Sequence, residues 1–172
     1  HRAFFTTFPI ISLDYALGKN WENNMRYAHT NIIAKDWKKL ARFYVDVFGC
    51  KVKPPERDLS GDWLDKATGL LNAKLKGVHL ILPGYGEDGP TLEIFSYKNL
   101  HERIPLMANH KGFTHIAFEV DDVEITFAKA LKNDGEKLGE IIEKEIKNVG
   151  VIKFTYLRDP EGNIIEIQSW KK

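Results

Sequence analysis

The two halves of the chain repeat one pattern of residues, and this duplication limits the folds open to it. His29 and His115 each lie in a β-rich segment and are each followed, seven residues later, by an aspartate. Each half then closes on another β-rich segment with a central glutamate, Glu93 or Glu166. Such a repeat indicates two copies of one supersecondary unit that bury a common core.

Each copy is predicted to have the order β-α-β-β-β, which makes the fold class α+β. In the first half, alternation and capping residues predict strand 27–34, a helix from Asp36 to Gly49, a short strand 50–54 that Pro54-Pro55 stops, and strands 77–83 and 90–97. In the second half they predict strand 112–120, a helix that starts at Asp122 and ends near Gly135, a strand at 138–143, and strands 151–159 and 163–170.

The repeat divides the chain into segments. We expect an extension at 1–25, a first module at 26–97, a linker at 98–111 and a second module at 112–172. The first module is longer because of an insert near 59–71, which is predicted to be a short helix with a loop.

Composition narrows the classes of function. The chain has 25 basic and 24 acidic residues, and this balance gives no reason to expect nucleic acid or an anionic membrane as a partner. No apolar run reaches the roughly 20 residues that a spanning helix needs. The single cysteine, Cys50, excludes an internal disulfide and favours a reducing, cytoplasmic location.

The repeated histidines and glutamates are candidate metal ligands. Either histidine alone is better explained as a structural strand residue, but His29, Glu93, His115 and Glu166 occupy equivalent places in both halves. A carboxylate placed mid-strand between aliphatic residues is costly to bury unless it is paired or binds a metal. Two imidazoles and two carboxylates suit one divalent ion of Ni, Co, Mn, Zn or Fe, without choosing among them.

Strand alternation also indicates which side chains share a face with these candidate ligands. The shared faces mix polar and aromatic groups, as expected of a ligand pocket, although core packing explains the aromatic residues equally well. The candidate substrate contacts are Asn31, Phe95, Tyr97, Phe113, Gln168 and Trp170. The opposite faces are almost wholly apolar and are expected to pack under the helices.

Four stretches of the chain resemble the vicinal oxygen chelate superfamily, which includes glyoxalase I, methylmalonyl-CoA epimerase, extradiol dioxygenases and antibiotic resistance proteins. They are AHTNIIAKDWKKLARFYVDVFG, GPTLEIFSY, GFTHIAFEVDDV and YLRDPEGNIIEI, within residues 26–170. The resemblance implies two βαβββ modules that form a cupped, incomplete β-barrel with the helices outside. It also implies that the first and last strands of each module supply the metal ligands, here His29, Glu93, His115 and Glu166, and that the protein is a homodimer.

The resemblance implies a lyase or isomerase that removes a proton next to a carbonyl of a small substrate with vicinal oxygens. Glu93 or Glu166 would act as the base, and the sequence leaves open which. Ile33 and Tyr97 stand where bacterial glyoxalase I has Arg and Asn, which argues against glutathione specificity. The alternative is a non-catalytic antibiotic-binding protein; an extradiol dioxygenase fits less well because its ligands usually lie in one module.

Overall fold

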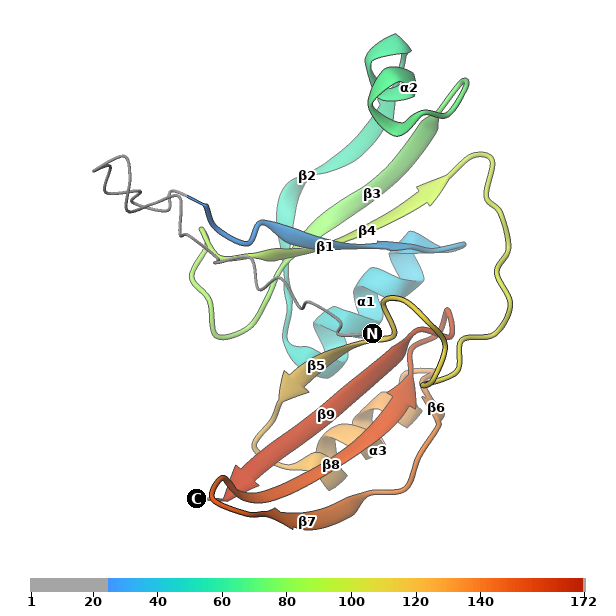
Figure 1. Ribbon diagram of the computed structural model, residues 1–172. Coiled ribbons are helices and arrows are strands. Elements are labelled where there is room, and N and C mark those ends of the chain that lie inside the picture. The colour runs from blue at the N-terminus through green and yellow to red at the C-terminus, as the bar shows by residue number, and fades with distance from the viewer. Residues whose placement is uncertain (1–24, 172) are drawn as a thin grey trace, which may run out of the picture.

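The structure, a computed structural model, describes residues 25–171 (Figure 1). The extension predicted at 1–25 therefore lies outside the described residues, apart from Met25. The described chain forms two separate open sheets, neither of which closes into a barrel, together with three helices. This is the α+β class that the duplication predicts.

The first module forms a four-stranded sheet. Its elements are β1 (His29–Ile33), α1 (Trp37–Phe48), β2 (Lys51–Ser60), α2 (Asp62–Thr68), β3 (Lys74–Ile81) and β4 (Thr91–Tyr97). The strand order is β1-β4-β3-β2, with β1 parallel to β4 and the other pairs antiparallel. Helix α2 lies in the predicted insert.

The second module forms a five-stranded sheet of related order. Its elements are β5 (His115–Glu119), α3 (Val123–Lys132), β6 (Glu136–Lys137), β7 (Ile142–Ile146), β8 (Gly150–Arg158) and β9 (Ile164–Lys171). The order is β5-β9-β8-β6, and β7 also pairs with β8. The single strand predicted at 138–143 is therefore wrong, because the chain forms two short strands that pair with different parts of β8.

Local signals in the sequence set the ends of the helices. The Asp36 carboxylate accepts hydrogen bonds from the backbone amides of Lys38 and Lys39, which satisfies donors that the first turn of α1 leaves free. Gly49 ends α1 with a φ of 71°, a left-handed conformation that glycine adopts at little cost. Asp122 caps α3 in the same manner, through the amide of Ile125.

The prediction that Pro54-Pro55 stops a strand is wrong, because β2 runs through both prolines. The register of β2 against β3 shifts between Lys53 and Arg57, which marks a bulge at the prolines. Strand β2 also lies at the edge of its sheet. Proline lacks a backbone N–H, and a bulge in an edge strand is one of the few places where a ladder tolerates it.

One apolar core joins the two modules. Helix α1 packs on β3 and β4 and also against α3. The rings of Phe48 and Phe118, one from each module, are stacked with their centroids 4.2 Å apart. The apolar faces of β4 and β9 are buried in this same core, as the alternation predicts, through Leu92, Ile94, Ile165 and Ile167. The glutamate-bearing face of each sheet is therefore the face turned away from the shared core.

Polar contacts reinforce the junction. The buried Tyr44 hydroxyl donates to the buried Asp159 carboxylate at 3.0 Å, and the Asp36 amide donates to Glu161 at 2.8 Å. The linker 98–111 holds no helix or strand, and Arg158 ties it down by donating to the Leu106 carbonyl at 2.7 Å.

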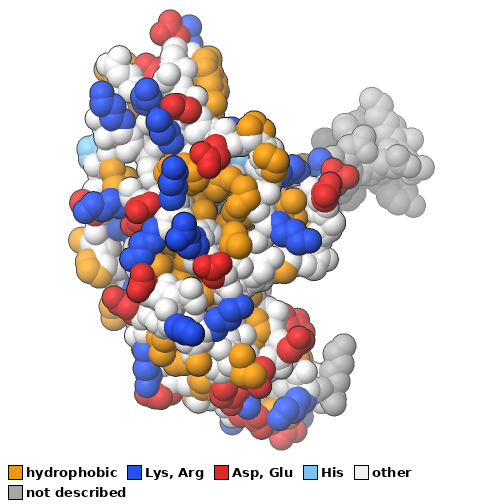
Figure 2. All heavy atoms as spheres, turned by 180° about the vertical axis from the view of Figure 1, so that it is seen from behind, with side chains coloured by type: hydrophobic (Ala, Val, Ile, Leu, Met, Phe, Trp, Pro, Cys, Tyr) orange, Lys and Arg blue, Asp and Glu red, His pale blue; other side chains and the backbone are white. Residues whose placement is uncertain are grey.

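On the face seen in Figure 2, basic and acidic side chains are interspersed among hydrophobic ones. Among residues 25–171, no helix is long and apolar enough to cross a membrane.

Candidate functional site

The four predicted ligands form two pairs, one in each module. In the first half-site, made of His29 and Glu93, the imidazole Nε2 lies 3.3 Å from the carboxylate Oε2. In the second half-site, made of His115 and Glu166, the same two atoms are also 3.3 Å apart. The repeat in the sequence is thus a repeat in geometry, and each pair presents one nitrogen and one oxygen donor.

Strand pairing accounts for this arrangement. Strands β1 and β4 are adjacent and parallel, as are β5 and β9, so the first and last strands of each module bring their side chains together. Both glutamates are largely buried, at 12% and 13% exposure, whereas the His29 and His115 side chains are 46% and 35% exposed. The carboxylates are therefore largely withdrawn from solvent, while the imidazoles are more open to it.

The two half-sites do not form one cluster within the chain. In the described part of the molecule, no three His, Cys, Asp or Glu side chains are placed to hold a single ion. The physical reason is the position of the core. Both sheets use their apolar faces to build it, so their ligand-bearing faces point away from it. Each histidine therefore meets the glutamate of its own module, and the four residues do not meet in one site within the described chain.

A third polar side chain adjoins each glutamate, and neither of these two side chains is among the site residues predicted from the sequence. His79 on β3 places its Nε2 3.1 Å from Glu93 Oε1. Tyr156 on β8 stands opposite Glu166 in the register, and its ring meets the His115 ring edge to face at 5.2 Å. His79 lies between the apolar residues Val78 and Leu80, which are buried in the core. Strand alternation therefore indicates that His79 is on the opposite face, the one that carries the glutamate.

Burial and neighbouring charge shift the pKa values of both side chains. Burial lowers the pKa of His79, and this outweighs the opposing effect of the Glu93 charge. Burial raises the pKa of Tyr156, and the adjacent Glu166 charge raises it further. Both shifts favour the neutral forms of His79 and Tyr156.

The predicted substrate contacts fall in different environments. Phe95 is buried in a small cluster with Leu64, Ala73 and Leu75, and Tyr97 packs against that cluster. The side chains of Gln168 and Trp170 bond to each other, the indole Nε1 donating to the amide oxygen at 3.3 Å. Asn31 donates to Glu93 Oε2 at 3.2 Å. Phe113 is 72% exposed beside β5.

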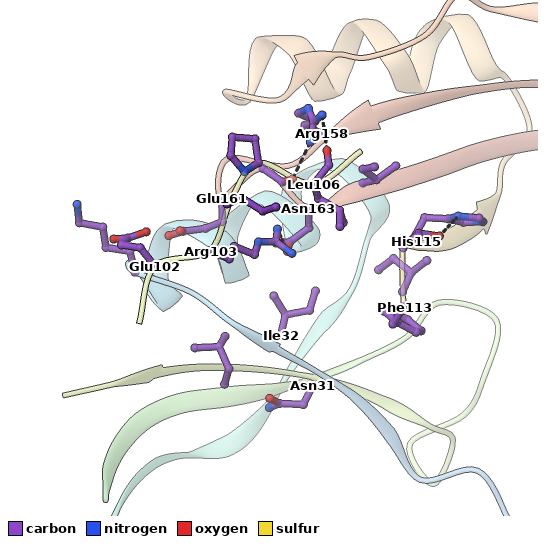
Figure 3. A pocket seen from close by; sticks show the side chains of 18 of the residues that line it. Asn31, Ile32, Glu102, Arg103, Leu106, Phe113, His115, Arg158, Glu161 and Asn163 are labelled. Carbon is purple, nitrogen blue, oxygen red and sulfur yellow. Dashed lines mark hydrogen bonds between the residues drawn. The ribbon is translucent and has the colours of Figure 1, made fainter. Parts of the chain in front are cut away.

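A cavity of about 630 Å³ lies between the two modules, with the linker forming part of its wall (Figure 3). Asn31, Phe113 and His115 line this cavity, but His29, Glu93 and Glu166 do not. Arg103 and Asn163 form a hydrogen-bonded pair in its wall, at 2.7 Å. The cavity thus reaches the second half-site through His115 without containing either carboxylate.

The donor set fits a divalent metal. Imidazole nitrogen and carboxylate oxygen are competent ligands for first-row transition metals, and each half-site already holds one of each at contact distance. The Nδ1 atom of His115 lies 3.2 Å from the Thr114 hydroxyl, which leaves Nε2 directed at Glu166. Such a contact on the second nitrogen is what orients a ligating histidine.

Comparison with known proteins identifies the family of the chain. The family model for the glyoxalase/bleomycin resistance protein/dioxygenase superfamily matches residues 26–167. This chain therefore belongs to that superfamily.

Among individual relatives, the chain is 26% identical over 142 residues to the uncharacterized protein YwbC of Bacillus subtilis strain 168, covering 82% of this chain and 94% of that protein.

Two solved structures show the shared fold. A glyoxalase family protein from Bacillus cereus superposes with a TM-score of 0.76 at 16% identity, over 90% of this chain and 99% of that one. The trypanothione-dependent glyoxalase I of Leishmania major superposes with a TM-score of 0.51 at 24% identity, over 84% of this chain and 86% of that one. At these identities the likeness concerns the fold alone.

Proposed function

We propose that this protein is a divalent-metal-dependent lyase or isomerase acting on a small substrate with two neighbouring oxygens. The observation that carries the proposal is the paired half-site, in which one imidazole Nε2 and one carboxylate oxygen lie 3.3 Å apart in each module. Together the halves offer two nitrogen and two oxygen ligands. Four protein ligands in an octahedral shell leave two positions for a chelating substrate.

The proposed reaction is proton transfer at a carbon next to a carbonyl. The carboxylate of Glu93 or Glu166 takes the proton, the C–H electron pair moves toward the carbonyl oxygen, and the proton returns to carbon from the same base. A bound divalent ion would supply Lewis-acid stabilisation of the negative charge that develops on that oxygen. The burial of both carboxylates keeps bulk water from competing for the proton.

The complete site is proposed to form between two copies of the chain. Strands β1 and β5 are edge strands, each paired on one side only among the described residues. Apolar side chains are exposed at or beside these edges, namely Tyr27, Ile33 and Phe113. A twofold axis that places β1 of one copy beside β5 of the other would bring each first half-site to a second half-site, giving two equivalent sites per dimer.

A complementation experiment tests this arrangement. The variants His29→Ala and His115→Ala each damage every site of their own homodimer. A mixed dimer of the two has one site with both halves intact and one with both halves damaged. Unfolding and refolding the variants together is therefore expected to restore about one metal ion per mixed dimer, together with partial activity. A site contained in one chain would give no restoration, and that outcome would contradict the dimer.

Two measurements test the proposed chemistry: the metal content of the protein, and the turnover of variants in which a glutamate is replaced. Wild-type protein is expected to contain close to one divalent ion per chain by mass spectrometry, and His115→Ala to lose it. Glu166→Gln and Glu93→Gln are then compared after metal loading, on α-oxo thiohemiacetals and acyl-CoA epimers. Replacing the base is expected to lower turnover by at least about 10²-fold. Full activity in both loaded variants would reject a glutamate base.

The cavity favours a second candidate function, metal-independent binding of a small molecule. Its walls combine apolar and polar side chains in similar measure, and neither Glu93 nor Glu166 lines it. This candidate predicts ligand binding that a chelator leaves unchanged and that Phe113→Ala weakens. Ligand screening by thermal shift with and without chelator separates it from the metal-dependent reaction.

A further inference from the structure

Glu93 is held from both sides, and Glu166 is not. Strand β4 lies inside its sheet, so Glu93 has a register partner on each neighbour, Asn31 on β1 and His79 on β3. Asn31 donates a hydrogen bond to Glu93, and His79 contacts it. The Asn31 amide donates to Oε2 at 3.2 Å, and His79 Nε2 lies 3.1 Å from Oε1.

The orientation of His79 is itself fixed. Its Nδ1 lies 3.3 Å from the hydroxyl of Thr91, a buried residue two positions before Glu93 on the same strand. Its ring also meets the Phe95 ring edge to face, with centroids 5.8 Å apart. When the Thr91 hydroxyl donates to Nδ1, the proton of a neutral imidazole is on Nε2, the nitrogen that lies 3.1 Å from the carboxylate. Thr91 and Phe95, on either side of Glu93, thus aim His79 at it.

The equivalent positions in the second module carry different residues. Ala117 on β5 and Tyr156 on β8 are the register partners of Glu166. The methyl group of Ala117 is not a hydrogen-bond donor, so the Asn31–Glu93 bond has no counterpart in the second module. The duplicated half-sites therefore share their ligands and differ in the groups that support them.

We propose that His79 and Asn31 are positioning residues that clamp Glu93 in its metal-binding orientation, so that the first half-site is built in advance and the second adapts. The inference rests on the proposed function, because it concerns a ligand of the same metal. Hydrogen bonds to ligating groups commonly change metal affinity by about 10- to 100-fold. Fixing the carboxylate before binding removes part of the entropy loss that ordering it would otherwise require.

Two variants of His79 separate the effect of its Nε2 atom on Glu93 from the effect of its ring packing against Phe95. His79→Phe keeps an aromatic ring against Phe95 and removes the donor, whereas His79→Gln places an amide nitrogen near the position of Nε2. The affinity of full-length protein for Co²⁺ is measured by competition with a chromophoric chelator, together with the visible spectrum of the bound ion. His79→Phe is expected to bind Co²⁺ about 10- to 100-fold more weakly. His79→Gln is expected to recover most of that loss.

Controls distinguish the possible failures. His101→Phe removes an imidazole from the linker and is expected to bind Co²⁺ as the wild type does. Thermal unfolding of the metal-free variants checks that each one folds. Equal Co²⁺ affinity in His79→Phe and wild type would overturn the clamp alone, as would a His79→Gln variant as weak as His79→Phe. A wild type that binds no Co²⁺, Ni²⁺, Mn²⁺ or Zn²⁺ would overturn the proposed function and the clamp with it.

Discussion

Replacing Tyr44 by phenylalanine tests whether one buried hydrogen bond holds the two modules together. The Tyr44 hydroxyl is one of four donors to the Asp159 carboxylate; it shares Oδ2 with the Asn163 side-chain amide, and two backbone amides bond to Oδ1. Both residues are almost fully buried, and burial raises the pKa of each. The substitution removes one oxygen atom and leaves a buried carboxylate with three donors.

The expected loss follows from this geometry. A hydrogen bond to a charged group contributes about 1.5–3 kcal/mol to stability. For a domain of this size, each kcal/mol lowers the melting temperature by roughly 2–4 °C, so Tyr44→Phe is expected to melt roughly 3–12 °C below wild type. Loss of the donor disfavours the ionised carboxylate and raises the pKa of Asp159 further. The deficit should therefore be largest at neutral pH and shrink as the pH falls through that pKa.

Urea denaturation followed by tryptophan fluorescence at pH 7 and pH 5 measures both effects. The matched control is Tyr85→Phe, which removes the hydroxyl of an exposed tyrosine and should change stability by less than about 0.5 kcal/mol. If Tyr44→Phe is as stable as this control at pH 7, the bond to Asp159 does not hold the modules together.

Three further changes test other features. Burial raises the pKa of the Cys50 thiol to about 12, so the thiol should react with a disulfide reagent only on unfolding. Between about pH 9 and pH 12 the thiol ionises in the unfolded chain but not in the folded one, so the stability of the protein should fall as the pH rises through this range. A side-chain carbon on Gly77 would lie 2.0 Å from the Ile94 carbonyl oxygen, so Gly77→Ala should lower stability by about 1–3 kcal/mol in urea denaturation or prevent folding, and wild-type stability would contradict this contact. Arg158→Met removes the donor to the Leu106 carbonyl, so limited proteolysis should cut the linker 98–111 faster than in wild type; an unchanged cleavage rate would show that other contacts hold the linker.

Much of the fold could be predicted because its signals are local. Asp36 and Gly49 mark the ends of α1, since a capping carboxylate and a left-handed glycine act on their own neighbours. The alternation of Leu92, Glu93 and Ile94 assigns one face of β4 to the core. The prediction that Pro54-Pro55 ends a strand was wrong, because the effect of the prolines depends on the position of β2 at the sheet edge. No local sequence pattern indicates that position.

The candidate site was predictable in its parts and less so in its arrangement. Repeat equivalence selected the two histidines and two glutamates, and strand pairing places each histidine beside the glutamate of its own module. His79 was not among the predicted site residues, because its contact with Glu93 depends on the exact register between β3 and β4. The separation of the half-sites depends on how the modules pack, through contacts such as the Phe48–Phe118 stack, and residue spacing within a module carries no information about that packing.

The opposite faces of the sheets give the molecule two sets of positions that can change independently during evolution. Leu92 and Ile94 maintain the core, while Glu93 between them takes part in the proposed chemistry, and the same division holds for Ile165, Ile167 and Glu166. A substitution on the outward face can alter metal, substrate or reaction while the packing that keeps the modules joined stays intact. A duplicated scaffold of this kind can therefore acquire new activities one side chain at a time without first losing its ability to fold.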